Sequence, residues 1–217
     1  MTIELLYNTP LWVAAKAIRK CWASEDKSDT LPHMDKACEI RGYENIGEKD
    51  KALIERVGNK NKHASTLEHL NYTFDIEGIS RACLQEVARH RHASMSVKST
   101  RYTLKELKEA PTDGTMDFRD FVVMTKDTRV NHSIMVGLEQ LQKRLQQGIS
   151  NDLAKYSIPE AYKTSLVWTI NMRSLQNFLS LRTDKAALWE IRELAYELFN
   201  QLPEEHKYMF TDYIKEK

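Results

Sequence analysis

Side chains that can bind phosphate are concentrated in one stretch of the sequence, RHRHASMSVKSTRY at residues 89–102. The stretch holds four Lys or Arg residues and four Ser or Thr residues, whereas the whole chain has a net charge of only +1. Arginine forks, ammonium groups and hydroxyls are the donors that bind phosphate in proteins. Composition alone allows a pocket for a small phosphorylated ligand, a nucleic-acid grip or a solvated basic surface.

A second stretch, residues 171–182, combines an apolar helical stripe with polar side chains. The 0, 3, 4, 7 spacing of a buried helical stripe is shared by Leu175, Phe178, Leu179 and Arg182. A guanidinium on a core-facing stripe needs an anion or several acceptors, and Asp184 is a candidate structural partner. Arg173 and Asn177, four residues apart, form another polar face that suits hydrogen bonding to a planar heterocycle or a ribose.

Two histidines and a glutamate, His63, Glu68 and His69, lie close together in the sequence. Their spacing differs from the HExxH pattern of zinc enzymes, and no third cluster of ligands accompanies them. We therefore expect no metal site here. We expect instead a loop in which Ser65 or Thr66 caps the next element.

The three cysteines, Cys21, Cys38 and Cys83, are odd in number and have no CxxC spacing. This pattern favours a reducing cytoplasm over a secreted disulfide framework. Cys83 falls on an apolar helical stripe, so we expect a core thiol and not a nucleophile.

The overall composition favours one helix-rich domain inside the cell. The chain has 217 residues, 41% of them hydrophobic, with only seven Gly and five Pro. Its 32 Lys plus Arg against 31 Asp plus Glu disfavour a bulk nucleic-acid binder. We find no signal peptide and no apolar run of about 20 residues. GxGxxG, GxxxxGK and GxSxG motifs are also missing from the sequence.

These residues must be positioned by a mixture of helices and a few strands. Thr9 and Pro10 predict the start of a first helix, and the alternation at 71–76 predicts a half-buried strand that ends at Gly78. Residues 24–50 and 94–102 are expected to be irregular. Helices are predicted at 50–58, 79–93, 134–145, 150–157, 160–181, 184–201 and 204–214. The expected fold is a single α+β domain over 1–217, mainly helical, with a small central antiparallel or mixed sheet.

Three ordered blocks of the sequence resemble the flavin-dependent thymidylate synthases (the ThyX family). Arg89-His90-Arg91, followed after seven residues by Ser99, resembles the family's RHR-x7-S signature. HASTLEH at 63–69 resembles its HxTxFEH segment, and NMRSLQNFLSLR at 171–182 resembles its N-x-R-S-L-x-N-F-x-x-L-R segment. Together the blocks span about 60–195, most of the chain.

The resemblance implies a homotetramer with FAD and dUMP bound at subunit interfaces. The implied reaction transfers a one-carbon unit from methylenetetrahydrofolate to dUMP, with NADPH reducing the flavin, and forms dTMP. No nucleic-acid or membrane partner is expected. The implied FAD ligands are Ser65, Arg89, His90, Arg91, Asn171, Arg173 and Asn177. The implied dUMP ligands are Glu86, Arg89, Val97, Lys98, Ser99, Thr100, Arg101, Lys155 and Arg182. By resemblance Arg182 is also the catalytic residue, since it would favour the ionised N3 form of uracil.

Several positions depart from the common family pattern. Glu86 stands where Gln is usual, and the adjacent Gln85 could take over that contact. Ser96 and Val97 replace Asn-Glu, Lys155 replaces Arg, and Ala186 stands where some members have His. Two alternatives remain open: another flavin enzyme acting on pyrimidine nucleotides, and a nucleic-acid-binding module that uses the basic 89–101 segment.

Overall fold

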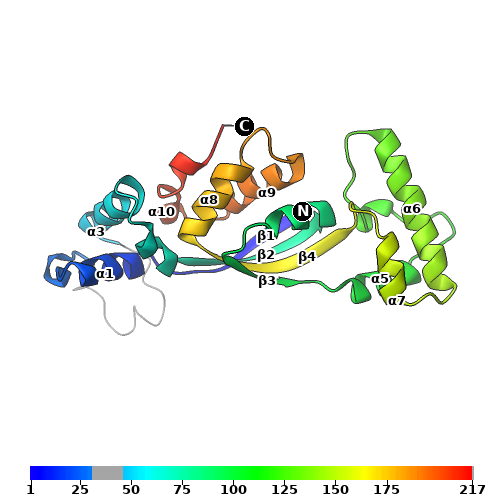
Figure 1. Ribbon diagram of the computed structural model, residues 1–217, viewed down its shortest axis with the longest axis horizontal. Coiled ribbons are helices and arrows are strands. Elements are labelled where there is room, and N and C mark those ends of the chain that lie inside the picture. The colour runs from blue at the N-terminus through cyan, green and yellow to red at the C-terminus, as the bar shows by residue number, and fades with distance from the viewer. Residues whose placement is uncertain (31–45, 217) are drawn as a thin grey trace. The chain divides into compact units, whose positions relative to one another are not determined.

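The computed structural model describes residues 1–30 and 46–216, so Cys38 and most of the polar 24–50 segment lie outside the described residues. It is a mixed α/β fold with one four-stranded sheet in the order β1-β2-β4-β3 (Figure 1). The strands are β1 Thr2–Asn8, β2 Asn71–Ser80, β3 Ala93–Val97 and β4 Lys163–Asn171. The predicted α+β fold with a small sheet is therefore confirmed.

Most of the helices are short. The α-helices are α1 Trp12–Cys21, α3 Glu48–Ile54, α4 Arg81–Val87, α5 Thr100–Glu109, α6 Thr128–Gln146, α7 Asn151–Ala154, α8 Met172–Arg182, α9 Trp189–Asn200 and α10 Glu204–Lys207. The remaining helical turns are η1 Glu25–Lys27, η3 Glu55–Lys60, η4 Ala64–His69, η5 Phe118–Asp120, η6 Lys155–Ser157 and η7 Thr211–Tyr213. Within the described residues, no helix is both long and apolar enough to cross a bilayer.

Strand β2 follows the predicted alternation, with Tyr72, Phe74 and Ile76 fully buried. It pairs antiparallel with β4, because Met172 N donates to Leu70 O at one end and Arg81 N donates to Tyr162 O at the other. The strand does not end at Gly78 as predicted. Gly78 adopts a φ of 74° within it, which a glycine tolerates without strain.

The predicted helix at 160–181 is wrong over its first half, where the chain forms β4. Alternate side chains of this strand point into the core, namely Thr164, Leu166, Trp168 and Ile170. Period-2 burial of large and β-branched residues is typical of a strand packed on one face. Strand β1, which no motif indicated, also alternates between half-buried and exposed positions along most of its length.

The predicted helix at 79–93 is also too long, because α4 ends at Val87. The supposedly irregular 94–102 segment instead contains most of β3 and the first turn of α5. Ser99 causes this second start: its Oγ accepts a hydrogen bond from Arg101 N at 3.3 Å and so caps α5.

Predicted helix starts were wrong at two further places. Thr9 does not cap α1, which begins at Trp12; its hydroxyl accepts from Asn71 N at 3.1 Å. Neither Ser65 nor Thr66 caps an element, and Thr66 Oγ1 donates to His63 O at 3.0 Å. The other predicted helices have mixed outcomes. The helix predicted at 134–145 lies within α6, and α9 begins five residues later than predicted. The helices predicted at 150–157 and 204–214 are each divided into two short helical pieces.

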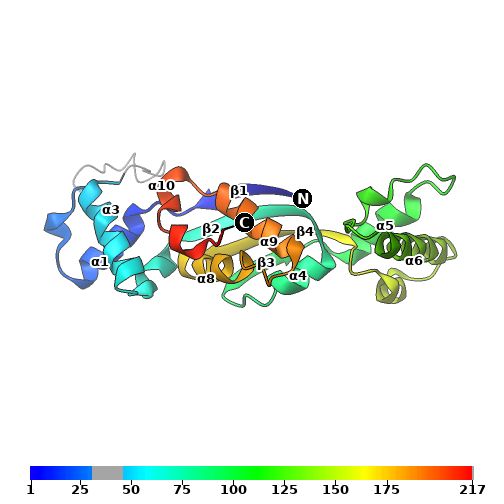
Figure 2. The same cartoon turned by 90° about the horizontal axis from the view of Figure 1, so that it is seen from above.

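By residue contacts the chain divides into two compact units. Unit 1 comprises Met1–Thr2, Ile76–Arg89 and Met95–Val167; unit 2 comprises Ile3–Asp75, His90–Ser94 and Trp168–Lys217. The core of unit 1 lies among α5, α6 and α7, and includes Leu104, Leu107, Leu138, Leu141, Leu145 and Tyr162. In unit 2, α8 and α9 cover one face of the sheet strands (Figures 1 and 2).

A buried hydrogen bond joins Tyr72 and His206 in the core of unit 2. Tyr72 OH lies 2.7 Å from His206 Nδ1, and both side chains are almost fully buried. Burial lowers the pKa of His206 to about 4 and raises that of Tyr72. Gln176 of α8 donates to Met209 O at 2.8 Å, which ties the helix to the same core.

Candidate functional site

The predicted site residues fall into two groups, one in each unit, and each group is described by itself. The group in unit 2 is built on α8. Asn171 starts this helix, because its Oδ1 accepts from Ser174 N at 2.9 Å as an N-cap. The two N–H groups of the Asn171 amide are then the donors that it can offer a ligand.

The apolar stripe predicted on α8 is buried as expected. Leu175, Phe178 and Leu179 are all fully buried. The Phe178 ring meets Trp168 of β4 edge to face, with centroids 5.1 Å apart, and meets His90 at 4.7 Å. These contacts fix the side of α8 from which Arg182 projects, and they place the imidazole of the RHR block against the same ring.

Arg182 donates from Nε to His90 Nε2 at 2.9 Å. Because this ring nitrogen accepts, the imidazole is neutral with its proton on Nδ1. Such a bond orients the guanidinium. Asp184, the partner that the sequence suggested, instead forms an ion pair with Lys215. This pair, together with an Ala186 N–H bond, lowers the Asp184 pKa.

The other predicted flavin ligands of unit 2 are exposed donors, which is the chemistry that a polar heterocycle and a pyrophosphate require. Arg173 and Asn177 lie four residues apart on the exposed side of α8, as predicted. Arg173 Nη1 pairs with Glu68 Oε1 at 2.7 Å. Ser65 and Arg91 are also exposed. The residues present are therefore suited to hold FAD.

Glu68 belongs to the segment that raised the question of a metal. Its carboxylate is engaged by Arg173, while His63 and His69 are exposed. Over residues 1–30 and 46–216, no three His, Cys, Asp or Glu side chains converge as metal ligands would.

The group in unit 1 is the nucleotide segment, by which we mean residues 97–101. It joins the end of β3 to the start of α5, and Lys98 N donates to Ser165 O of β4 at 2.8 Å. Thr100 is half-buried, and the segment's other side chains are exposed. The segment thus offers a capped helix start together with hydroxyl and cationic side chains, which suits a phosphate.

Each of three predicted substrate cations of unit 1 is paired with a carboxylate. Arg89 Nη1 lies 3.6 Å from Oε1 of Glu86, three residues earlier in the sequence. Lys98 Nζ lies 3.0 Å from Glu106 Oε1, and Arg101 Nε lies 3.4 Å from Asp152 Oδ1. Sequence reasoning missed Glu106 and Asp152, because nothing in a single sequence shows which surface carboxylates meet which cations.

Lys155, which replaces an Arg of the family pattern, and Gln85, which is adjacent to the departing Glu86, both have local partners. Gln85 Nε2 donates to Glu160 Oε2 at 2.7 Å. Lys155 Nζ lies 5.8 Å from the centroid of the neighbouring Tyr156 ring. Both side chains are exposed, so a ligand can reach either.

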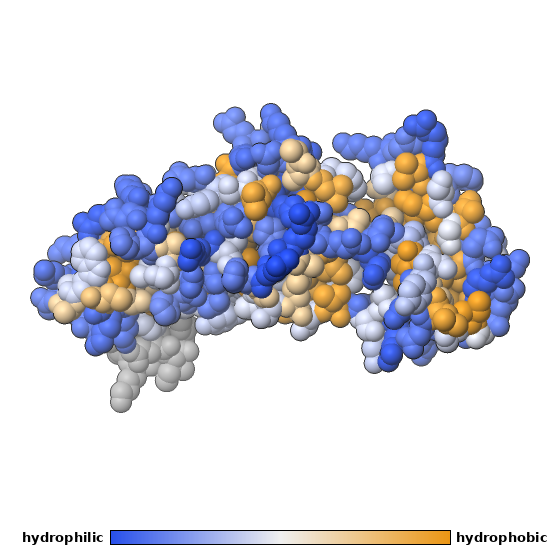
Figure 3. Space-filling view, viewed as in Figure 1, coloured by the Kyte–Doolittle hydropathy of each residue, from blue (hydrophilic) through white to orange (hydrophobic). Residues whose placement is uncertain are grey.

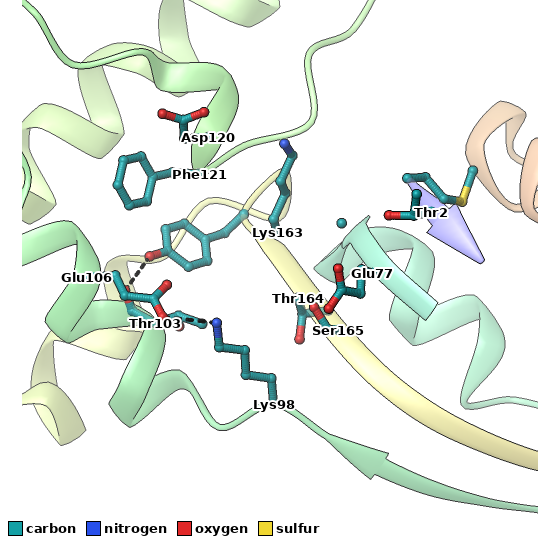
Figure 4. A pocket seen from close by; sticks show the side chains of 13 residues that line it. Thr2, Glu77, Lys98, Thr103, Glu106, Asp120, Phe121, Lys163, Thr164 and Ser165 are labelled. Atoms are coloured by element: carbon teal, nitrogen blue, oxygen red, sulfur yellow. Dashed lines mark hydrogen bonds and ion pairs between the residues drawn. The ribbon is translucent and has the colours of Figure 1, made fainter. Parts of the chain in front are cut away.

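A polar cavity of about 330 Å³ lies beside Lys98 (Figure 4). Lys98 and Glu106 point toward each other at its rim, and Tyr162 OH donates to Thr103 O at 3.0 Å. Burial raises the Tyr162 pKa to about 12. Five charged side chains line the cavity, namely Glu77, Lys98, Glu106, Asp120 and Lys163.

Comparison with known proteins gives a consistent result over the whole chain. Residues 4–206 match the family model described as thymidylate synthase complementing protein. The chain is 55% identical to a flavin-dependent thymidylate synthase of Wolinella succinogenes over 213 residues, covering 97% of both chains. It is 56% identical to that of Campylobacter jejuni, covering 97% of this chain and 96% of the other. Among solved structures, ThyX from Helicobacter pylori with FAD and dUMP superposes with a TM-score of 0.85 at 46% identity, covering both chains fully.

Proposed function

The chain belongs to the family of flavin-dependent thymidylate synthases, and from this premise we propose that it converts dUMP to dTMP with FAD as its cofactor. One structural observation carries the proposal. Two motif blocks meet in the hydrogen bond between His90 and Arg182, which are 92 residues apart in sequence. This contact orients a cationic side chain on an apolar helix stripe, as chemistry on a pyrimidine requires.

We propose that FAD is held by the set of residues that the family resemblance implies. Its members are Ser65, Arg89, His90, Arg91, Asn171, Arg173 and Asn177. When bound, FAD supplies the reducing equivalents for the transferred carbon. Methylenetetrahydrofolate is the proposed carbon donor and NADPH the proposed reductant. Arg173 would exchange Glu68 for the ligand, since exposed ion pairs are weak.

We propose that dUMP is bound by the nucleotide segment together with four further residues of the implied set. Its members are Glu86, Arg89, Val97, Lys98, Ser99, Thr100, Arg101, Lys155 and Arg182. Arg101 provides a bidentate fork for the phosphate, while Lys98 and Lys155 act as point charges. The Ser99 hydroxyl would donate to the phosphate while its oxygen still caps α5.

Arg182 is the proposed catalytic residue. Its fixed positive charge would favour the ionised N3 form of uracil and stabilise negative charge that develops on the ring. The hydrogen bond that Arg182 donates to His90 holds the guanidinium in one orientation before substrate arrives, which lowers the reorganisation that the reaction requires. Cys83 is fully buried in the core, where it acts as a packing residue.

A homotetramer with active sites at subunit interfaces is the proposed assembly. Large apolar side chains are exposed on the helices of unit 1 and in the turn between α6 and α7, including Tyr102, Val130, Val136, Ile149 and Leu153. In Figure 3, hydrophobic residues gather over the region of α5, α6 and α7. Extended apolar surface of this kind marks contact sites with other chains. We also propose that residues 1–217 form a single catalytic domain that works in the cytoplasm, as the cysteine pattern favours.

The test is a flavin spectrum of the purified protein, followed by a product assay. We expect a yellow protein that oxidises NADPH faster with dUMP and forms dTMP when methylenetetrahydrofolate is added. Flavin binding without dTMP formation would favour another flavin enzyme on pyrimidine nucleotides. Protein that binds neither FAD nor dUMP, and instead binds long DNA in a salt-dependent manner, would overturn the proposal.

A further inference from the structure

The cations of the nucleotide segment are already neutralised by the protein itself. Lys98 pairs with Glu106 of α5, and Arg101 pairs with Asp152 of α7. All four side chains are substantially exposed, between 41% and 72%. Exposed pairs of this kind contribute little stability and exchange readily with another anion. A phosphate can therefore take the place of either carboxylate.

The surroundings of Lys98 are acidic as well as basic. The cavity beside it is also lined by Glu77 and Asp120 (Figure 4). Its other lysine, Lys163, donates a hydrogen bond to the backbone oxygen of Arg119. A carboxylate that gives up Lys98 thus stays near the bound phosphate, in a region that already holds negative charge. Each further phosphate on the ligand adds repulsion against these groups.

We propose that Glu106 and Asp152 are specificity-determining residues that restrict the site to nucleoside monophosphates. One phosphate dianion replaces the two carboxylates at Lys98 and Arg101 and is accepted. A triphosphate such as dUTP carries more negative charge, so the same displaced carboxylates repel it more strongly and it is rejected. This inference rests on the proposed function, because it assumes that the segment binds dUMP.

The chain offers a matched control on the same helix. Glu109 lies three residues after Glu106 on α5 and pairs with Lys105 at 3.9 Å, with both side chains exposed. Neither residue belongs to the nucleotide segment or lines the cavity beside Lys98. Glu109→Gln therefore removes one surface carboxylate of the same type and changes the net charge equally, without touching the proposed device.

The experiment compares dUMP and dUTP binding by calorimetry. FAD-loaded wild type, Glu106→Gln, Asp152→Asn, the double variant and Glu109→Gln are titrated at one fixed ionic strength, since screening alters such effects. Flavin absorbance and elution volume verify that each variant is assembled. We expect wild type to prefer dUMP. Glu106→Gln and Asp152→Asn should each reduce that preference by about two- to fivefold. The double variant should reduce it further, and Glu109→Gln should leave it as in wild type.

Two results would overturn the inference in distinguishable ways. If wild type binds dUMP but the dUMP-to-dUTP ratio is the same in all variants, the specificity role fails and the proposed function stands. The specificity role also fails, and the proposed function stands, if Glu106→Gln increases the affinity for dUMP and for dUTP by the same factor. If wild type carries FAD and binds no dUMP, the assignment of the nucleotide segment fails first, and the specificity role with it.

Discussion

Helix α8 of unit 2 and the nucleotide segment of unit 1 both carry cationic side chains, but these side chains are held by different kinds of contact. On α8, Arg182 is held by a hydrogen bond to His90, above a stripe of fully buried apolar side chains. In the nucleotide segment, Lys98 and Arg101 are exposed and meet carboxylates through surface ion pairs. One arginine is fixed by packing, and the other cations are free to change partners.

This difference follows from what each group is proposed to do. A charge that stabilises a developing anion is effective only when it is oriented beforehand, so it belongs on a packed element. Cations that capture and release a phosphate must exchange partners on every turnover, so weak exposed pairs suit them. If this is correct, substitutions in the two regions should differ in size and in kind.

The largest effect should come from Phe178→Ala, which removes the ring that packs against Trp168 and His90. We expect a loss of about 3–5 kcal/mol in the free energy of unfolding, measured by urea denaturation, because the side chain is fully buried. Val97→Ala in the nucleotide segment is the counterpart. Its side chain is 41% exposed, so we expect a loss below about 0.5 kcal/mol. Equal losses would remove the structural distinction between the two regions.

Arg182→Ala should have the next largest effect, on turnover and not on folding. Loss of one preorganised electrostatic contact lowers kcat by about 10²–10³-fold, measured as dTMP formation by the FAD-loaded protein. Arg182→Lys keeps a charge but places it on a single flexible ammonium, and should recover only part of the rate. Flavin absorbance and the urea midpoint should stay close to wild type. A variant that keeps a third of its activity would show that Arg182 is not the catalytic charge.

The sequence predicted the buried face of α8 correctly, but it did not predict the strand β4 that precedes this helix. The spacing of Leu175, Phe178 and Leu179 identified the buried face of α8, because helical periodicity depends only on local order. The prediction of helix for the strand just before α8 is wrong, because a short apolar run is ambiguous between strand and helix. The alternation of Leu166, Trp168 and Ile170 is the signal that resolves it.

Contacts between distant residues could not be predicted. Three motif blocks contain most of the proposed ligands, but no pattern indicated that His90 would accept a hydrogen bond from Arg182. Glu106 and Asp152 were missed for the same reason, because an ion pair depends on how β3, α5 and α7 pack. Only its nearness in sequence favours Asp184 as the partner of Arg182. In the structure Asp184 forms an ion pair with Lys215 instead.

Acid should weaken unit 2, which carries α8, through His206. Burial lowers its folded pKa to about 4 from an ordinary 6.5, so the unfolded chain takes up the proton first. Stability is therefore complete above pH 6.5 and is lost as the pH falls from 6.5 to about 4. The total loss is about 3 kcal/mol at most. Urea midpoints across this range should report it.

Unit 1 should respond to acid in a different range. The Arg129 side chain and backbone lower the pKa of Asp127, at the start of α6, to about 2. Its contribution is present above pH 3.8 and is lost only below that value. His206→Gln should abolish the dependence between pH 6.5 and 4, while exposed His69→Gln should retain it. A dependence that survives His206→Gln would assign the acid sensitivity to another group.

The smallest effect, and the sharpest test of the nucleotide segment, concerns Ser99. Its oxygen caps α5 through Arg101 N, so Ser99→Ala should cost about 1 kcal/mol of unfolding free energy. Ser99→Asp restores a capping oxygen, and its stability should return to within about 0.5 kcal/mol of wild type. Its carboxylate, however, would stand where the phosphate of dUMP is proposed to bind. Calorimetry should then show a lower affinity for dUMP in both variants, with a larger loss for Ser99→Asp than for Ser99→Ala. If Ser99→Asp recovers both dUMP affinity and stability, Ser99 is only a helix cap. The phosphate is then bound by the cations of the nucleotide segment and not by the Ser99 hydroxyl.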